Sequence, residues 1–211
     1  MALAITPAPF AAPAITPAEA AASLSYPAYR QLITQLLAAG KTTGPTQSAD
    51  LLTYARLNQQ RMQRLDKTVQ VLPALRAAVQ ALPQRYRWLI IAEGWCGDAA
   101  QLVPAFEAVA RASQGRIETR YLLRDDNPPL TGRYLTHGTR SIPKLLMLHA
   151  DTLAEVAVWG PRPQAAQALV RRFRAEGQTM QEFGPELHRW YTHDKTLSTQ
   201  RELLALVQQL A

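Results

Sequence analysis

Residues 87–99 decide the fold, and they read RWLIIAEGWCGDA. The first part, up to Ala92, is a short and continuously apolar run, which is typical of a β-strand buried on both faces. From Gly97 to Ala112 the apolar residues recur at helical spacing, which predicts an amphipathic helix. Cys96 therefore lies where a buried strand passes into a helix, next to backbone N–H groups that have no partner within the helix.

The residues after this junction continue to alternate between strand and helix patterns. Three further strands are predicted over residues 116–123, 144–149 and 153–159. Two helices are predicted from 127 to about 138 and from 161 to about 176. The element order is β-α-β-α-β-β-α, which indicates an α/β domain over residues 86–177.

Helical patterns flank this domain on both sides. Helices are predicted over residues 27–39, 48–79, 180–191 and 197–210. Pro73 kinks the second of these helices and Pro83 marks its exit. We therefore expect residues 1–85 to form a helical extension, and residues 178–211 to form C-terminal helices that pack on the domain. The Ala- and Pro-rich N-terminus is interpreted as a loosely ordered arm that becomes helical near Glu19.

Composition narrows the class of protein. The chain has 211 residues, of which 47% are hydrophobic and 18% charged, as in proteins that bury a core. No run approaches the ~18 apolar residues of a membrane span, so we expect no membrane insertion. The net charge of +7 comes from scattered basic residues, which we interpret as a solvated surface rather than a nucleic-acid interface. Arg162, beside a predicted helix start, is a candidate for binding an anion.

Cysteine and histidine usage bears on metals and on the compartment. The four histidines show no metal-ligand spacing with one another or with Cys96, which is the one cysteine of the chain. We therefore expect no metal and no other cofactor. Prolines at four of the first 17 positions interrupt the apolar stretch that a secretory signal requires. Together with the single free cysteine, this favours a cytoplasmic protein.

The residues around Cys96 resemble the thioredoxin family. Residues 95–97 read Trp-Cys-Gly directly after the apolar strand, and Pro104 stands where thioredoxins carry a proline that kinks the helix. Residues 141–143 read Ser-Ile-Pro before a strand, and look like the cis-proline loop of that family. With the element order over residues 88–176, the resemblance implies a thioredoxin-like fold, in which a central mixed β-sheet is flanked by helices.

Cys96 and Asp98 are the expected catalytic residues. The N–H groups and the dipole of the helix favour the Cys96 thiolate, so we expect a partly exposed thiol with a lowered pKa. Asp98 suits the first turn of the helix but opposes formation of a thiolate, so the two effects on the pKa of Cys96 conflict. Arg124, Arg140 and Lys144 flank segments that we expect near the site, where their charge would favour the thiolate.

Five residues are expected to contact the substrate. Trp95 supplies a flat apolar flank beside the sulfur, and Gly97 lets another chain approach closely. We expect the Ile142–Pro143 bond to be cis, which frees the peptide of Ile142 to pair with an extended substrate strand. Arg140, directly before this loop, is the fifth residue expected to contact the substrate.

Two departures from thioredoxin determine the expected mechanism. Disulfide-reducing thioredoxins carry a second cysteine three residues after the first, where this chain has Ala99. Their buried acid, six residues before the first cysteine, is replaced by Ile90. The resemblance therefore implies a monothiol oxidoreductase, in which Cys96 attacks a protein or low-molecular-weight disulfide and an external thiol resolves the adduct.

The alternative is a redox-inactive module that holds a peptide in the groove beside Pro143. Peroxidase chemistry is disfavoured, since no Thr/Ser and Arg arrangement for binding a peroxide is recognised.

Overall fold

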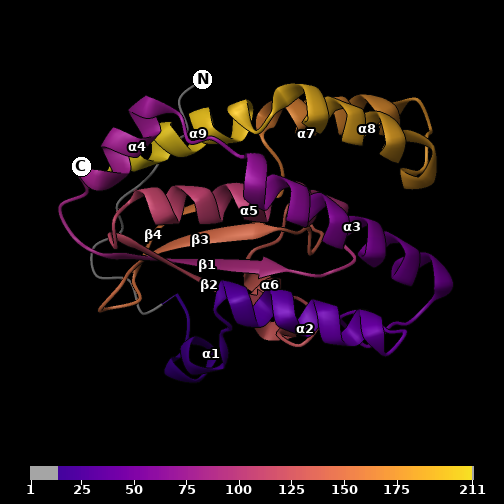
Figure 1. Cartoon of the computed structure of the whole chain (residues 1–211), viewed down its shortest axis with the longest axis horizontal. Coiled ribbons are helices and arrows are strands. Elements are labelled where there is room, and N and C mark those ends of the chain that lie inside the picture. The colour runs from indigo at the N-terminus through magenta and orange to yellow at the C-terminus, as the bar shows by residue number, and fades with distance from the viewer. Residues whose placement is uncertain (1–13, 211) are drawn as a thin grey trace.

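A four-stranded sheet lies at the centre of the molecule in the computed structural model, which describes residues 14–210 (Figure 1). The strands are β1 (Tyr86–Ala92), β2 (Ile117–Leu123), β3 (Lys144–His149) and β4 (Glu155–Trp159). Their order is β2-β1-β3-β4. β1 runs parallel to β2 and antiparallel to β3, and β3 and β4 are antiparallel. The expected α/β class with a mixed sheet is confirmed.

β1 is a central strand that has neighbours on both edges. Leu89, for example, is paired with Arg120 of β2 and with Leu146 of β3. From Trp88 to Ala92 every side chain of β1 is buried. A strand that helices cover on both faces has no solvent side, and this explains why the apolar run does not alternate with polar residues.

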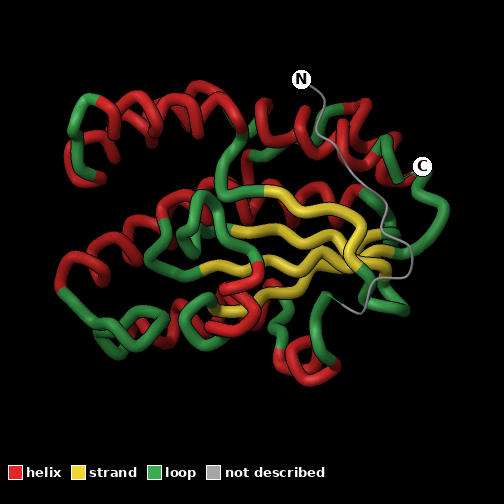
Figure 2. Tube along the Cα trace, turned by 180° about the vertical axis from the view of Figure 1, so that it is seen from behind, coloured by secondary structure: helices red, strands yellow, loops and turns green. Residues whose placement is uncertain are grey.

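Helices lie on both sides of the sheet (Figures 1 and 2). On one side are α1 (Pro17–Ala22), α2 (Tyr26–Ala38) and α6 (Pro128–Arg133). On the other side, α5 (Gly97–Ala112) packs against α3 (Ala49–Thr68) and α4 (Pro73–Gln80). An outer layer beyond α5 contains α7 (Gln164–Ala175), α8 (Met180–Asp194) and α9 (Leu197–Val207). The site described below lies between this outer layer, α3 and the start of α5.

The long kinked helix expected over residues 48–79 is in fact two helices. α3 ends at Thr68 and α4 begins at Pro73. Leu72, the residue before the proline, has φ −54° and ψ 135°, because a following proline disfavours the helical conformation. The backbone N–H of Leu72 donates to Gln200 Oε1 of α9 at 2.8 Å. The break is therefore stabilised by the C-terminal helix, which local sequence patterns do not reveal.

The N-terminal segment is packed from the first residues that the structure describes. The expected arm falls partly on residues 1–13, which lie outside the described residues. Thr16 and Glu19 form a capping box that starts α1, in agreement with the expected onset of helix near Glu19. Leu24 then forms an antiparallel bridge with Tyr121 of β2. The N-terminal extension is thereby attached to the edge of the sheet.

Candidate functional site at the start of helix α5

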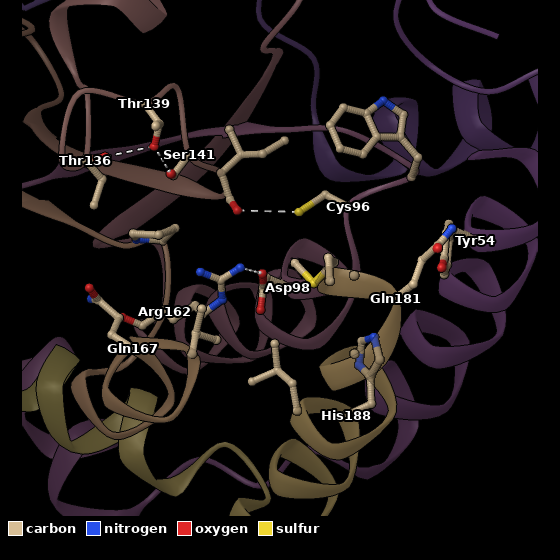
Figure 3. A pocket seen from close by; sticks show the side chains of 18 of the residues that line it. Tyr54, Cys96, Asp98, Thr136, Thr139, Ser141, Arg162, Gln167, Gln181 and His188 are labelled. Atoms are coloured by element: carbon tan, nitrogen blue, oxygen red, sulfur yellow. Dashed lines mark hydrogen bonds and ion pairs between the residues drawn. The ribbon is translucent and has the colours of Figure 1, made fainter. Parts of the chain in front are cut away.

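Cys96 is the N-cap residue of α5. Its backbone is extended (φ −77°, ψ 114°), and its Sγ accepts a hydrogen bond from the N–H of Ala99 at 3.4 Å. Sγ also donates to the carbonyl oxygen of Ile142, again at 3.4 Å (Figure 3). The Ile142–Pro143 bond is cis. The thiol therefore lies between the start of the helix and the loop before β3, two segments that the sequence analysis brings together.

The expected partial exposure and lowered pKa of Cys96 are wrong. The residue is only 7% exposed, and burial raises the pKa of its thiol to about 12, with a further contribution from the charge of Asp98. The N–H of Ala99 and the charge of Arg162 lower the pKa but do not outweigh these effects. The sequence reveals the helix start, but not the loss of water around the sulfur. Cys96 is therefore a protonated thiol at neutral pH.

Asp98 joins three separate segments of the fold. One carboxylate oxygen lies 2.5 Å from Nη2 of Arg162, in the loop between β4 and α7, and the other accepts a hydrogen bond from Tyr191 Oη of α8 at 2.7 Å. The side chains of Asp98 and Arg162 are only 5% and 12% exposed. The cation beside the candidate site is thus Arg162, which the sequence analysis names only as a candidate for binding an anion.

The three other cations expected near Cys96 have different partners. Arg124 lies over the Trp95 ring, with its Cζ atom 4.7 Å from the ring centroid, and forms an ion pair with Asp125. Lys144 donates to Thr136 Oγ1 at 2.5 Å. Arg140 is exposed, and with Lys144 it lines a separate small cavity. The positive charge that lowers the pKa of the Cys96 thiol therefore comes from Arg162 rather than from these three side chains.

Gly97 lies directly against α8. A Cβ atom at position 97 would lie 2.9 Å from both Cε1 and Nε2 of His188. His188 Nδ1 lies 3.2 Å from Gln101 Nε2. Burial, assisted by the charge of Arg61, lowers the pKa of His188 to about 4, so its ring is neutral at neutral pH. The close approach that glycine permits here is made by the chain itself, and no local pattern marks His188 for this role.

A buried acid stands three residues before Cys96. Glu93 is fully buried, as is Ile90 at the position where thioredoxins carry their acid. The N–H of Asp125 donates to Glu93 Oε1 at 3.0 Å, whereas Oε2 has no hydrogen-bond partner among residues 14–210. Burial raises the pKa of this carboxyl group. Glu93 is a candidate that the sequence analysis missed, although a carboxylate directly after a buried apolar run is a visible signal.

A cavity of about 640 Å³ opens beside Cys96 (Figure 3). We call one side the inner wall; it comes from the start of α5 and the loops around it. It consists of Trp95, Cys96, Gly97, Asp98, Arg124, Thr136, His137, Thr139, Ser141, Ile142, Pro161 and Arg162. The outer wall comes from α3, α7 and α8. It consists of Leu51, Tyr54, Leu57, Arg61, Gln167, Val170, Arg171, Arg174, Met180, Gln181, Gly184, Pro185, Leu187 and His188.

The residues expected to contact substrate are divided by this geometry. Trp95, Gly97 and Ile142 line the cavity together with Cys96 and Asp98. Pro143 is buried and does not line the cavity, and Arg140 lines the smaller cavity instead. The outer wall is absent from the sequence-based site, because it depends on how α3, α7 and α8 pack.

Neither a membrane-spanning helix nor a metal-binding cluster is found within residues 14–210. Within that range no helix combines the length and apolar character needed to cross a membrane. The same residues contain no group of three or more His, Cys, Asp or Glu side chains that could hold a metal ion. The chemistry-bearing groups found near the cavity are the Cys96 thiol, the carboxyl groups of Glu93 and Asp98, two imidazoles and the arginines.

Comparison with known proteins identifies the family. A thioredoxin family model matches residues 44–180, more than half of the chain. The fold is similar to the crystal structure of a protein of unknown function from Pseudomonas aeruginosa, with a TM-score of 0.53 and 19% identity, covering 89% of this chain and 99% of that chain. An HIV epitope scaffold is similar with a TM-score of 0.52 and 19% identity, covering 89% and 100% of the two chains. At this identity the two structures establish the fold alone. The family match and the Trp-Cys-Gly junction agree, and the chain belongs to the thioredoxin family.

Proposed function

We propose that the protein carries out monothiol thiol–disulfide exchange through Cys96, with an external thiol as the resolving partner. The observation that supports this most directly is the position of the sulfur. Sγ caps α5, faces the Ile142 carbonyl across the cis-proline loop and lines the large cavity. Ala99 occupies the position of a resolving cysteine, and the chain has no second cysteine. A disulfide that enters the cavity would meet this one nucleophilic sulfur.

The exchange takes two balanced steps. The Cys96 thiolate attacks a disulfide R–S–S–R′, a new Cys96–S–S–R bond forms, and the R–S–S–R′ bond breaks. The proton that Cys96 loses ends on the departing R′ thiolate. A second thiol, R″SH, then attacks the Cys96 adduct and releases R–S–S–R″. Cys96 recovers its proton, so the net reaction transfers the RS group from R′S to R″S and releases R′SH, without any net change in oxidation.

Ionisation of the Cys96 thiol is unfavourable in the free protein. With a thiol pKa of about 12, almost no thiolate is present at neutral pH in the free protein. The N–H of Ala99 and the guanidinium of Arg162 favour the thiolate, whereas burial and Asp98 oppose it. The attack rate of the free protein is therefore expected to rise with pH throughout the range from neutral to alkaline.

The test follows the adduct and its release. Native protein, Cys96→Ser and Ala99→Cys are first reduced and freed of reductant, then incubated in separate reactions with oxidised glutathione or with insulin, and the products are followed by mass spectrometry. Native protein should form a Cys96 adduct that reduced glutathione removes, and Cys96→Ser should form none. Positions 96 and 99 share one helix face, so reduced Ala99→Cys should reduce insulin in a single turnover and finish with an internal disulfide.

Two results would exclude the proposed function. If native protein forms no adduct even at alkaline pH, exchange through Cys96 is excluded. If native protein reduces insulin fully without added thiol, the monothiol mechanism is excluded.

Ligand binding without redox turnover is the second candidate. One observation favours it: the Cys96 thiol is protonated and donates its hydrogen to Ile142 O. In that case Cys96 contributes to the shape of the cavity and not to chemistry. The rate of Cys96 alkylation as a function of pH separates the two functions. An alkylation rate below that of a free cysteine at every pH, combined with the absence of an adduct, supports the binding function.

A further inference from the structure

The outer wall carries arginines that no acid neutralises. Arg61 comes from α3, and Arg171 and Arg174 come from α7. Within residues 14–210 none of these three forms an ion pair. Arg172, the neighbour of Arg171 in sequence, lies outside the cavity and approaches Glu176 and Glu186 instead. The arginines that the outer wall contributes to the cavity are thus without an acidic partner among residues 14–210.

The inner wall does not compensate this charge. Among the described residues, Asp98 is the one acidic side chain that lines the cavity. Both of its oxygens are already used, by Arg162 and by Tyr191. The charge of Arg124 is balanced by Asp125. The cavity therefore has an excess of positive charge that comes from the outer wall.

Arg61 is fixed by one hydrogen bond and keeps further N–H groups available. It is half-buried, and its Nη1 donates to Asn58 Oδ1 at 2.8 Å. The Asn58 amide is itself fixed, because its Nδ2 donates to Gly94 O at 3.1 Å. A guanidinium has five N–H donors, and this contact uses one of them. Arg61 is held in place while most of its donors remain free for a ligand.

Apolar side chains cluster on the same wall. Five large hydrophobic residues are notably exposed in the described chain, and three of them line this cavity: Tyr54, Leu57 and Met180, at 40 to 49% exposure. Exposed apolar side chains that gather at one place, rather than scatter singly, are typical of binding sites. The outer wall thus combines apolar surface with unpaired positive charge.

We propose that this cavity binds a small amphipathic anion, whose carboxylate or phosphate group is held by Arg61, Arg171 and Arg174. The apolar part of the ligand lies against Tyr54, Leu57 and Met180. Arginine matches both anionic groups through paired N–H donors. The volume of about 640 Å³ is within the range of small-molecule sites. The site needs no reaction at Cys96, so this proposal goes beyond the exchange function and stands without it.

The experiment uses the full-length chain with Cys96→Ser, so that failure of the exchange function cannot affect the result. Isothermal titration calorimetry compares four probes with an eight-carbon chain: octanoate, octyl phosphate, octanol and octyltrimethylammonium. At least one of the two anions should bind more tightly than octanol, and the cation should bind most weakly. The stronger of the two anions identifies the head group that the site prefers.

Paired variants test the residues. Arg171→Gln with Arg174→Gln should weaken binding of the anion by about tenfold or more, since two charge-assisted contacts are lost. The matched control is Arg172→Gln with Arg189→Gln, two exposed arginines of α7 and α8 that do not line the cavity. The control removes the same net charge and should change affinity by less than about twofold.

Three outcomes overturn the proposal. One is binding of octanol or the cation as tight as that of the anions. Another is an equal loss of affinity in both double variants, which would indicate a general charge effect. The third is absence of binding of both anions at millimolar concentration, and it would leave an acidic peptide as the occupant to examine.

Discussion

The two walls of the cavity differ in whether their charged side chains are paired. On the inner wall, Asp98 is matched by Arg162 and Tyr191, so its charge is used within the protein. On the outer wall, Arg171 and Arg174 have no acidic partner within residues 14–210. Removing one member of a buried charge pair leaves the other charge uncompensated inside the fold, whereas unmatched charges that face a cavity remain available to another molecule. Substitutions on the inner wall should therefore mainly lower the free energy of unfolding, and substitutions on the outer wall should mainly weaken ligand binding.

The largest effect is expected from Asp98→Asn. Asp98 and Arg162 are both buried, and removing one partner of a buried ion pair costs about 3 kcal/mol or more, because it leaves an uncompensated charge. The same change removes a charge that raises the pKa of Cys96. Urea unfolding should show the lost stability, and iodoacetamide alkylation at neutral pH should be faster than in native protein. Asp151→Asn, in an exposed turn, is the control that should change neither property.

Arg162→Gln provides the opposite test of the same pair. It should also destabilise the protein, because Asp98 is left buried without its cation. However, Arg162 lowers the pKa of Cys96, so its removal should slow alkylation instead of accelerating it. If both variants shift the alkylation rate in the same direction, unfolding rather than charge controls the thiol.

Gly97→Ala should have the next largest effect. The new methyl group would lie 2.9 Å from two atoms of the His188 ring, and such crowding costs typically 1–3 kcal/mol. Gly97→Ala combined with His188→Ala should recover most of this loss, because the methyl group then has space and alanine is favoured over glycine in a helix. Unfolding free energies of the two single variants and the double variant measure the coupling. Additive losses would show that Gly97 serves a purpose other than contact with α8.

Glu93→Gln tests the buried charge behind the inner wall. The folded-state pKa of Glu93 is raised, so its stabilising contribution is present below the unfolded pKa of about 4.3 and is lost as pH rises through the higher folded value. Native protein should therefore lose stability relative to Glu93→Gln between acidic and neutral pH. Glu118→Gln is the control with opposite sign, because Arg120 and Arg87 lower the pKa of Glu118. Parallel stability–pH curves for native protein and Glu93→Gln would contradict the prediction.

The contrast between the walls also shows what sequence can predict. The strands, α5 and the position of Cys96 follow from local patterns such as the apolar run of β1 and the Trp-Cys-Gly junction. The contact between Asp98 and Tyr191 joins residues 93 positions apart, and no local pattern predicts it. The expected pKa of Cys96 is wrong for a related reason, because a helix start is visible in sequence, whereas burial depends on distant segments.

The smallest effect on stability is expected from the outer wall. Arg171→Gln with Arg174→Gln removes two exposed side chains that make no ion pair within residues 14–210. Surface substitutions of this kind change the unfolding free energy by about 0.5 kcal/mol or less. Arg172→Gln with Arg189→Gln also removes the two ion pairs of Arg172, but these are long and exposed and contribute little. Urea unfolding of both double variants should therefore give midpoints close to that of native protein in the absence of ligand.

Adding octanoate or octyl phosphate should then separate the two double variants. A ligand that binds only the folded state raises stability according to its affinity, so the anion that binds native protein should stabilise the Arg172/Arg189 variant and leave the Arg171/Arg174 variant almost unchanged. A large loss of stability in the Arg171/Arg174 variant without ligand would mean that these arginines already have partners within the fold. The outer wall would then, like the inner wall, have its charges paired within the protein.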